Sequence, residues 1–409
     1  MNDLKCPLNS LTEGQWFKLI CGASFQHLPA VRNITLAYTL AGADCIDVAA
    51  DPAVVAAAKE ALQVAGNIAD DADKWGDRRP SILRKNNLPL LMVSLNDGED
   101  PHFRKAQFDA NLCPADCPRP CEQICPAQAI VFDNPKEELR INNPRTVNSQ
   151  SSIENSVPGG GVIEERCYGC GRCVPVCPLG LITTRSYVST PTAIAPTVLS
   201  KGVDAVEIHT CVGRLSDFKR LWSSISPWVD SLKAIAISCP DGPDLIDYLW
   251  AMYETISPLP CALIWQTDGR PMSGDIGIGT THATVKLGQK VLAAGLPGYV
   301  QLAGGTNHHT VAKLKAMGLL KSSVASRHPY IAGVAYGSYA RVQLTSILEQ
   351  LEERSDRLFQ ESEVSGVASP LRLEDFPDLL WQAVDLAYSL VAPLKFPVQY
   401  KCNTNNTVP

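Results

Sequence analysis

The stretch Cys45-Ile-Asp-Val-Ala-Ala50 is a short, mostly apolar run that ends at Asp51, and the alanine-rich segment Pro52–Ala65 follows it directly. A mostly apolar run of this length is typical of a strand in a parallel sheet that is covered on both faces. An alanine-rich segment that opens with proline is typical of a helix. Together the two segments predict one βα unit.

Strand-like runs of the same kind recur along the chain. Most are bounded by Gly, Pro, Asp or Asn, and most are followed by a helical pattern. The seven further runs are Phe17–Gly22, Leu90–Leu95, Ala205–His209, Ala234–Ser238, Ala262–Gln266, Tyr299–Ala303 and Ile331–Ala335. Eight βα units predict an α/β fold of the (β/α)8 TIM-barrel type. An open doubly wound sheet is the alternative if this segmentation errs by one strand.

Length and composition limit the classes of protein to consider. The chain has 409 residues, 45% of them apolar, so we expect two or three domains and a sizeable core. A formal charge of −6 without a long basic run argues against a nucleic-acid partner. The opening MNDLKCPLNS has no signal-peptide pattern, and no window reaches the ~18 apolar residues that a membrane helix needs. We therefore expect a cytoplasmic protein that is not an integral membrane protein.

A cysteine-rich segment begins just after the third predicted strand and looks like an insertion in a βα loop, at the face where barrels carry their active sites. Four parts are predicted: 12–99 as the first part of the barrel, 100–190 as an inserted ferredoxin-like α+β iron–sulfur module, 191–355 as the second part of the barrel, and 356–409 as a C-terminal helix and tail. In the last part, we expect the helical pattern Phe376–Leu394 to dock on the barrel. The stretch 146–161, which ends in three glycines, is expected to be a loop.

The second cysteine run reads Cys167-Tyr-Gly-Cys170-Gly-Arg-Cys173-Val-Pro-Val-Cys177-Pro178. This is the C-x2-C-x2-C-x3-C-P run of bacterial ferredoxins. Three thiolates spaced by two residues on a tight, glycine-containing loop can reach three corners of one cube, while the fourth points toward another cluster. Zinc is the alternative because CxxC pairs also bind zinc. A zinc site usually has two well-separated pairs, however, and gives no reason for Pro178.

The first cysteine run reads Cys113-Pro-Ala-Asp-Cys117-Pro-Arg-Pro-Cys121-Glu-Gln-Ile-Cys125-Pro126, with three residues in each interval. The repeat of two runs predicts two iron–sulfur clusters with exchanged fourth ligands. One set is Cys125, Cys167, Cys170 and Cys173, and the other is Cys113, Cys117, Cys121 and Cys177. Both clusters are expected to be [4Fe–4S]. The wider spacing of the first run leaves a [3Fe–4S] form open for one of them.

Two glycine-containing loops follow the last two predicted strands: Gly304-Gly305 and Gly337-Ser338. In many barrels these loops bind a phosphate-bearing ligand through backbone amides and a helix N-terminus, and we expect such a site here. The alternative is that the glycines only make tight βα turns.

Further polar residues stand at strand ends and are candidates to line a substrate pocket: Asn96, Asp97, Glu207, His209, Gln266 and Asp268. Asp and Asn at βα junctions are also ordinary helix caps. No combination among these residues has the spacing of a known catalytic motif, so no catalytic base is predicted.

The blocks Trp16-Phe-Lys-Leu-Ile-Cys-Gly-Ala-Ser24 and Tyr38–Pro52, together with the paired cysteine runs, resemble the cyanobacterial LdpA family of light-dependent period proteins. The similarity extends from about residue 12 to the eighth strand. The resemblance implies a cytoplasmic iron–sulfur protein that passes the redox state set by photosynthesis to the circadian clock. Clock-input and clock proteins are the partners that it implies, and a redox carrier such as a quinone or a ferredoxin is a further expected partner. The resemblance implies no catalytic residue.

Two functions follow as hypotheses. In a redox sensor, the oxidation state or occupancy of the clusters changes the inserted module, and partner proteins bind the two states differently. In an oxidoreductase, the clusters deliver electrons to a substrate or cofactor at the C-terminal face of the barrel. A plain electron carrier is a third interpretation, but 409 residues are far more than that task needs.

Overall fold

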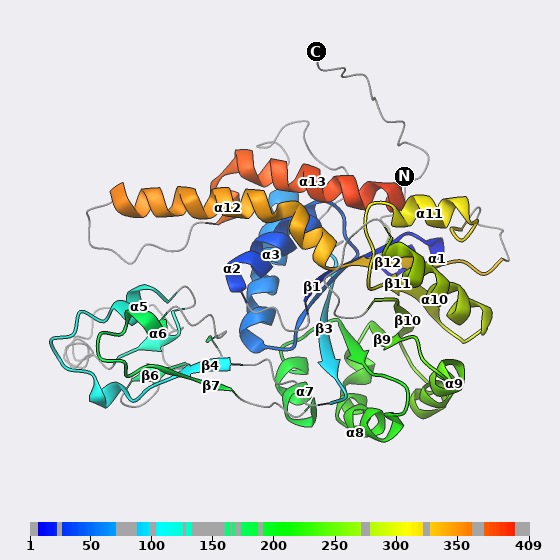
Figure 1. Cartoon of the computed structure of the whole chain (residues 1–409), viewed down its shortest axis with the longest axis horizontal. Coiled ribbons are helices and arrows are strands. Elements are labelled where there is room, and N and C mark those ends of the chain that lie inside the picture. The colour runs from blue at the N-terminus through cyan, green and yellow to red at the C-terminus, as the bar shows by residue number, and fades with distance from the viewer. Residues whose placement is uncertain are drawn as a thin grey trace, which may run out of the picture.

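The computed structural model describes residues 7–22, 27–70, 88–98, 104–125, 128–132, 160–163, 166–167, 173–186, 191–270, 279–321, 328–361 and 372–396. Eight parallel strands close into one barrel (Figure 1). They are β1 (Trp16–Gly22), β2 (Cys45–Ala49), β3 (Leu90–Asn96), β8 (Ala205–His209), β9 (Ala234–Pro240), β10 (Ala262–Asp268), β11 (Tyr299–Ala303) and β12 (Gly333–Tyr336).

The barrel is closed because β1 pairs with both β2 and β12, in the order β1-β12-β11-β10-β9-β8-β3-β2. The predicted TIM-like barrel is therefore confirmed, and each of the eight predicted strands corresponds to one of its strands. The alternative of an open doubly wound sheet is wrong, because such a sheet would leave two of these strands unpaired on one side.

Helices connect the strands and cover the outside of the barrel (Figure 1). They are α1 (Asn9–Glu13), α2 (Leu28–Leu40), α3 (Pro52–Asp70), α7 (Pro191–Leu199), α8 (Leu215–Ile225), α9 (Leu245–Ile256), α10 (Thr281–Ala293), α11 (Thr310–Ala316), α12 (Ser338–Glu361) and α13 (Pro377–Lys395), with the 3-10 turns η4 (Ser226–Ser231) and η5 (Leu373–Asp375). Within the described part of the chain, no helix is both long and apolar enough to cross a membrane.

Helix α3 shows how the sequence starts these helices. The Asp51 side chain accepts a hydrogen bond from the backbone N–H of Ala53 at 2.8 Å, and Pro52 has no N–H that would need a partner. The alanines Ala58, Ala61 and Ala65 are fully buried in the main core. Their small side chains let the helix lie close to the barrel wall.

The barrel interior is divided into an apolar and a polar layer. Residues of the apolar layer lie in the N-terminal half of the strands and include Trp16, Cys45, Met92, Ala205, Ala236 and Ile264. Side chains two residues apart in a strand point to the same face. The positions two residues further along therefore also face inward, and they are polar: Lys18, Asp47, Ser94, Glu207, Ser238 and Gln266.

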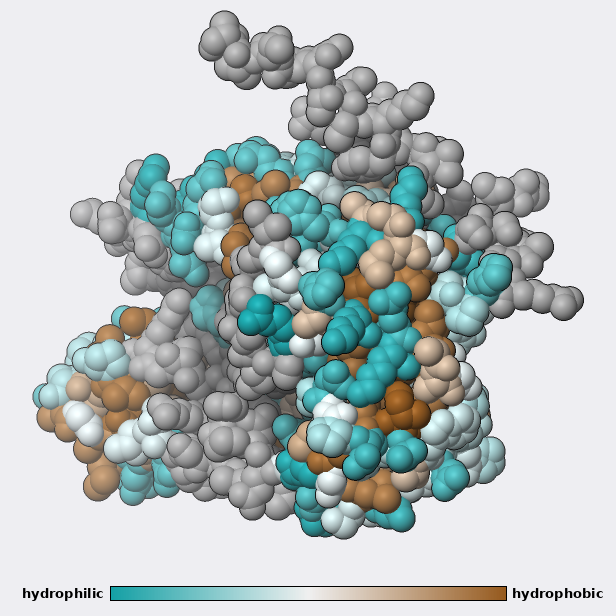
Figure 2. All heavy atoms as spheres, turned by 45° about the vertical axis from the view of Figure 1, so that its right-hand side comes forward, coloured by the Kyte–Doolittle hydropathy of each residue, from teal (hydrophilic) through white to brown (hydrophobic). Residues whose placement is uncertain are grey.

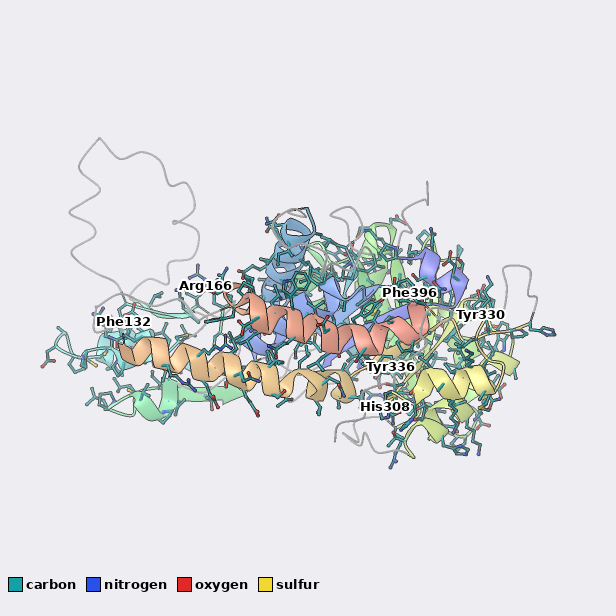
Figure 3. The ribbon with its side chains drawn as sticks, turned by 90° about the horizontal axis from the view of Figure 1, so that it is seen from above. Phe132, Arg166, His308, Tyr330, Tyr336 and Phe396 are labelled. Atoms are coloured by element: carbon teal, nitrogen blue, oxygen red, sulfur yellow. The ribbon has the colours of Figure 1, made fainter. Side chains whose placement is uncertain are left out.

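The C-terminal helix α13 lies beside α12 and packs against the barrel (Figure 3). Lys395, its last residue, forms an ion pair with Asp44 and donates a hydrogen bond to the Ser10 hydroxyl at 3.0 Å. Asp44 also accepts the backbone N–H of Phe17 at 2.7 Å. The helical pattern expected at Phe376–Leu394 is thus a helix docked on the N-terminal end of β1 and β2.

The inserted module lies between β3 and α7, to one side of the barrel (Figure 1). Two antiparallel pairs frame it: β4 (Arg104–Gln107) with β7 (Thr183–Ser186), and β5 (Ile130–Val131) with β6 (Gly161–Val162). Its short helical turns are η3 (Ala110–Leu112), α5 (Pro120–Gln123) and α6 (Cys173–Val176). The residue limits given above for the four parts of the chain stay predictions. Apart from residues 160–161, the stretch 146–161 lies outside the described residues.

A buried ion pair joins this module to the barrel. The ammonium of Lys105, on β4, lies 3.3 Å from the carboxylate of Asp51, directly before α3. Both side chains are more than nine-tenths buried. Because an isolated buried charge is costly, each of these groups depends on the other, and the pair fixes β4 against the barrel.

Candidate functional site

Four cysteines from the two runs line one pocket of the module. Cys113, Cys117 and Cys121 line it together with Cys177, and the pocket is partly open to solvent. The rest of the wall is apolar: Phe108, Pro120, Phe132, Pro178, Leu179, Leu181 and Ile182. This is the set of four that the exchanged-ligand prediction groups together, although its ligand role stays a prediction.

The arrangement of thiols bears on what the pocket can hold. Among the residues that the structure describes, no three His, Cys, Asp or Glu side chains converge closely enough to hold a single metal ion. Four cysteines are a ligand set that iron–sulfur clusters and zinc ions both use, so the preference for a cluster rests on the spacing of the two cysteine runs.

Local structure positions the first three of these cysteines. Asp109 caps η3 by accepting the N–H of Asn111 at 2.9 Å, and Cys113 follows this turn. Arg119 adopts a left-handed backbone (φ 52°), which reverses the chain before α5, and its guanidinium stacks 4.3 Å above the ring of Phe132. A left-handed backbone at a non-glycine residue costs roughly 1 kcal/mol. The stacking of Arg119 helps to offset this cost and so stabilises the turn that leads into Cys121.

The thiols of this pocket differ in their readiness to ionise. Burial, together with the hydrogen bond to Cys117, raises the pKa of Cys113 above the ordinary thiol value. Burial also raises the pKa of Cys121. At Cys177 burial acts in the same direction, but the backbone N–H groups of residues 179–182 outweigh it and lower the pKa. Cys177 therefore forms a thiolate more readily than Cys113 or Cys121.

The other cysteines of the two runs form the second predicted set. Cys167 and Cys173 are buried in one apolar cluster that also contains Cys121, and Cys125 and Cys177 pack against it. Cys170 lies outside the described residues. The Sγ of Cys125 accepts the N–H of Ala129 at 3.2 Å, just as Cys177 accepts that of the residue four positions later, at 3.4 Å. The last cysteine of each run therefore accepts the same kind of N–H···S bond.

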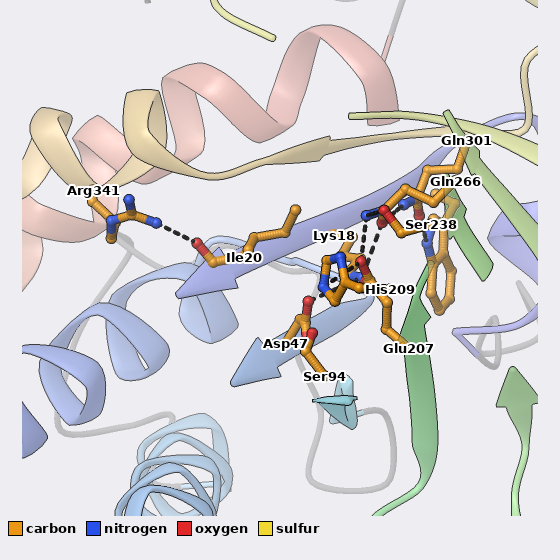
Figure 4. Close-up of polar contacts among 11 residues, drawn as sticks. Lys18, Ile20, Asp47, Ser94, Glu207, His209, Ser238, Gln266, Gln301 and Arg341 are labelled. Carbon is orange, nitrogen blue, oxygen red and sulfur yellow. Dashed lines mark hydrogen bonds and ion pairs between the residues drawn. The ribbon is translucent and has the colours of Figure 1, made fainter. Parts of the chain in front are cut away.

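Inside the barrel, Lys18 stands at the centre of the polar layer (Figure 4). Its ammonium lies 3.1 Å from Asp47, contacts Glu207 directly, and donates to the side-chain oxygen of Gln266 at 3.0 Å. Lys18 and Glu207 are fully buried, and Asp47 is 1% exposed. His209 lies 3.1 Å from Glu207 on the side of the strand ends, and its side chain is 30% exposed.

Hydrogen bonds extend this network across the barrel. The amide of Gln266 donates to Glu207 at 2.5 Å and to the Ser238 hydroxyl at 3.2 Å. The Gln301 amide donates to Gln266 at 2.6 Å, and the Trp16 indole donates to Gln301 at 2.7 Å. A layer of this kind is unusual, because the interior layers of such barrels are dominated by branched apolar residues.

The predicted pocket residues thus separate into two groups. Glu207, His209 and Gln266 belong to the layer around Lys18, whereas Asp97 instead accepts from Thr210 at 2.6 Å. Sequence reasoning missed Lys18. The available signal was its place in the first strand, two residues after Trp16, as the only charged residue of an otherwise apolar run.

The structure shows why small residues occupy the two glycine-containing loops. A side chain on Gly304 (φ 62°) would begin 1.8 Å from the carboxylate of Asp268, whose pKa burial raises to about 6. Gly305 is also left-handed, at φ 93°. Gly337 precedes α12, and Ser338, its first residue, accepts a hydrogen bond from Arg341 at 3.1 Å. These contacts account for tight turns, and the phosphate site stays a prediction.

The described geometry can now be compared with known proteins. A family model described as the LdpA Fe-S cluster-binding domain matches residues 113–188, from the first cysteine of the pocket to just beyond β7. A second model, the Light dependent period A C-terminal domain, matches residues 197–393. Light dependent period A of Synechococcus elongatus is 48% identical over 389 residues, which cover 95% of this chain and 94% of that protein. The chain belongs to the LdpA family.

Family membership confirms the resemblance seen in the sequence. The LdpA cluster-binding domain spans all eight cysteines of the two runs, so this segment is an iron–sulfur cluster-binding domain. The LdpA C-terminal domain begins within α7 and takes in five strands of the barrel.

Two solved structures overlay weakly on most of the chain. Tryptophan synthase from Mycobacterium tuberculosis is 11% identical with a TM-score of 0.37, covering 95% of this chain and 98% of that one. Fructose-bisphosphate aldolase from Campylobacter jejuni is 8% identical with a TM-score of 0.31, covering 96% and 91%. These likenesses are too distant to bear on function.

Proposed function

We propose that this protein is a cytoplasmic iron–sulfur redox sensor that relays the light-dependent redox state set by photosynthesis to the circadian clock. The observation that carries the proposal is the pocket in which Cys113, Cys117 and Cys121 meet Cys177. The LdpA family supports it, since the relative from S. elongatus bears the name Light dependent period A. Clock-input and clock proteins are the partners that the proposal requires.

The proposed cofactors are two [4Fe–4S] clusters, which supply one-electron redox chemistry when bound. Cys113, Cys117, Cys121 and Cys177 would hold one, and Cys125, Cys167, Cys170 and Cys173 the other. The wider spacing of the first run keeps [3Fe–4S] as the alternative for the cluster in the lined pocket.

Backbone donors around the thiols are suited to this role. The N–H groups of Ala106, Ala129 and Leu181 donate to cysteine sulfurs at 3.2–3.4 Å. Such bonds stabilise negative charge on sulfur. They therefore make a bound cluster easier to reduce and tune its reduction potential. Their strength depends on the charge at the sulfur, so backbone position and redox state are coupled.

The strand β4 offers a path from the module to the barrel. Ala106 donates its N–H to the Cys167 sulfur, and its neighbour Lys105 holds the buried ion pair with Asp51. A shift of β4 on reduction would act directly on the start of α3. A sensor needs such a contact, because it must present two different surfaces to its partners.

The first experiment is anaerobic purification with iron and sulfide counting, followed by electron paramagnetic resonance before and after dithionite reduction. We expect about eight irons per chain and a signal from two interacting reduced centres. About four irons, or a three-iron signal in the isolated protein, would limit the proposal to one complete cube. Zinc without iron would contradict it.

Sensing itself is tested by partner binding. Oxidised and reduced protein, each with full iron, are immobilised and exposed to a cyanobacterial lysate, and bound clock proteins are identified by mass spectrometry. We expect a clock-input protein to be retained by one redox state more than by the other. Equal retention by both states would argue against a sensor.

An oxidoreductase is the second candidate, and the polar layer around Lys18 favours it. Burying Lys18 with Asp47 and Glu207 stabilises the fold less than apolar packing of similar volume would. A charged layer of this kind on the C-terminal side of a barrel fits a substrate or cofactor site. A small molecule that co-purifies stoichiometrically, and that is released on denaturation, would support this function. Loss of that molecule in Lys18→Met would place it in the barrel.

A further inference from the structure

Large apolar side chains are exposed around the thiol pocket. Among the described residues, five large hydrophobic side chains are exposed, and three of them belong to the module: Leu112 (64%), Leu179 (53%) and Ile124 (39%). Leu112 directly precedes Cys113, and Leu179 is itself part of the pocket wall. Figure 2 shows hydrophobic side chains gathered on this lobe, at the lower left of the view. An exposed apolar patch of this kind marks an interaction site.

The pocket beneath this patch is close to the surface. Cys113, Cys117 and Cys177 are each partly exposed. The exposed Pro114 and Pro178 stand next to them, and their fixed backbone leaves little flexibility to lose on binding. A partner seated on Leu112 and Leu179 would therefore lie directly over the thiols, where the path for an electron is shortest.

Exposed acidic side chains lie in the same segment as Leu112, Cys113 and Cys117. Asp109, Asp116 and Glu122 are exposed, and the one cation of the segment 109–125 is Arg119, which stacks on the ring of Phe132. The formal charge of this segment is therefore negative, and metal-bound thiolates add to it. Complementary charge at the rim of an interface selects the partner and speeds encounter.

We propose that this face, consisting of Leu112, Leu179 and the carboxylates of Asp116 and Glu122, docks a one-electron carrier protein whose apolar centre is ringed by basic side chains. This inference rests on the proposed function and names its electron partner. One electron passes between the cluster held by Cys113, Cys117, Cys121 and Cys177 and the carrier, so that one is oxidised as the other is reduced, and no atom or proton is transferred. Acidic carriers are repelled from the same face.

Binding is tested with ferric cytochrome c, a basic one-electron protein, titrated calorimetrically into the oxidised, iron-loaded full chain. We expect binding that weakens as salt is added. The charge variant Asp116→Lys with Glu122→Lys should weaken it about tenfold, since each rim charge contributes on the order of several-fold. Leu112→Ser with Leu179→Ser should weaken it by about the same factor, through loss of apolar contact.

Matched controls carry the same changes elsewhere. Asp230→Lys with Glu254→Lys reverses two exposed carboxylates of the barrel, and Met317→Ser with Val342→Ser removes the two large apolar side chains that are exposed outside the module in the described part of the chain. Both should bind cytochrome c as the unmodified protein does. Equal weakening in the controls and in the patch variants would overturn the proposal, because net charge alone would then explain binding.

Electron transfer provides a second readout. Stopped-flow oxidation of the dithionite-reduced protein is compared with cytochrome c and with a short-chain benzoquinone as acceptors. Slower transfer to cytochrome c alone in the patch variants supports a protein partner. Slower transfer to the quinone alone would overturn the docking proposal and would favour a small apolar carrier.

Iron content separates this inference from the proposed function. Every variant is assayed for iron and sulfide, and the single variants Asp116→Lys and Leu112→Ser, neither of which lies in the pocket wall, decide the result if a double variant loses iron. Unmodified protein without iron would contradict the proposed function itself. Unmodified protein with full iron that does not bind cytochrome c at low salt would overturn only the docking proposal.

Discussion

The substitution Lys18→Met tests the charged layer of the barrel most directly. Lys18 lies 3.1 Å from Asp47 and contacts Glu207, and none of the three side chains is more than 1% exposed. Methionine has a similar length but no charge, so the change leaves two carboxylates buried with no cation beside them. Removing one partner of a buried ion pair costs about 3–5 kcal/mol. That is a large share of the roughly 5–15 kcal/mol by which a domain is stable.

The assay is urea unfolding of the full chain at neutral pH, followed by tryptophan fluorescence and circular dichroism. Lys290→Met is the matched control, because Lys290 pairs with Asp241 at 2.7 Å but both side chains are about half exposed. This surface pair should contribute at most about 1 kcal/mol. We expect Lys18→Met to lower the free energy of unfolding by several times the loss in the control.

A compensating variant identifies the cause. Lys18→Met combined with Asp47→Asn and Glu207→Gln removes all three charges while keeping the side-chain volumes, so it should recover most of the lost stability. The reasoning would be refuted if Lys18→Met cost no more than Lys290→Met. A triple variant less stable than Lys18→Met would likewise show that uncompensated charge is not the source of the loss.

Four further predictions concern other parts of the molecule. Cys173→Ser should lose mainly one cluster and Cys117→Ser mainly the other, and iron counts that stay full in either variant would contradict the exchanged ligands. Burial raises the Asp268 pKa from 3.8 to about 6, so the folded form holds the proton to higher pH than the unfolded form, and stability falls as pH rises from about 4 through about 6. Asp268→Asn should flatten this part of the unfolding profile, by an amount on the order of 3 kcal/mol. Gly304→Ala, whose new methyl would overlap the same carboxylate in a left-handed backbone, should cost about 1–3 kcal/mol in thermal unfolding, and adding Asp268→Ala should recover the part due to overlap. Lys105→Met should keep its iron but abolish any redox-dependent change in hydrogen exchange at the start of α3; persistence of that change would exclude the β4 path.

The cysteine runs show how far local sequence can lead. The spacing x2, x2, x3 with proline fixes which thiols can reach one cube, because short loops have few conformations, and the family comparison agrees that the segment binds iron–sulfur clusters. The repeat alone predicts the exchange of the fourth ligand. The fold then brings Cys177 to the pocket of Cys113, Cys117 and Cys121, through contacts between segments far apart in the chain.

The glycine loops show the opposite case. Two glycines after a strand are compatible with a phosphate cradle and with a tight turn, and sequence cannot separate the two. The structure brings Asp268 of β10 against Gly304 after β11, which explains that glycine as space for a carboxylate. Neither residue is near the other in sequence, so no local pattern contains this contact.

The sequence by itself determined the eight βα units and the family, and it predicts the two cysteine sets, because each depends on order and spacing within short segments. Only the tertiary structure decided that Lys18 lies inside the barrel beside Asp47 and Glu207. The physical reason is that barrel strands are buried on both faces. Alternation in such strands separates two sets of side chains, but it does not say which set faces the interior and which faces the helices. Closure of the sheet makes that choice, and it depends on the pairing of β1 with β12 at the far end of the chain.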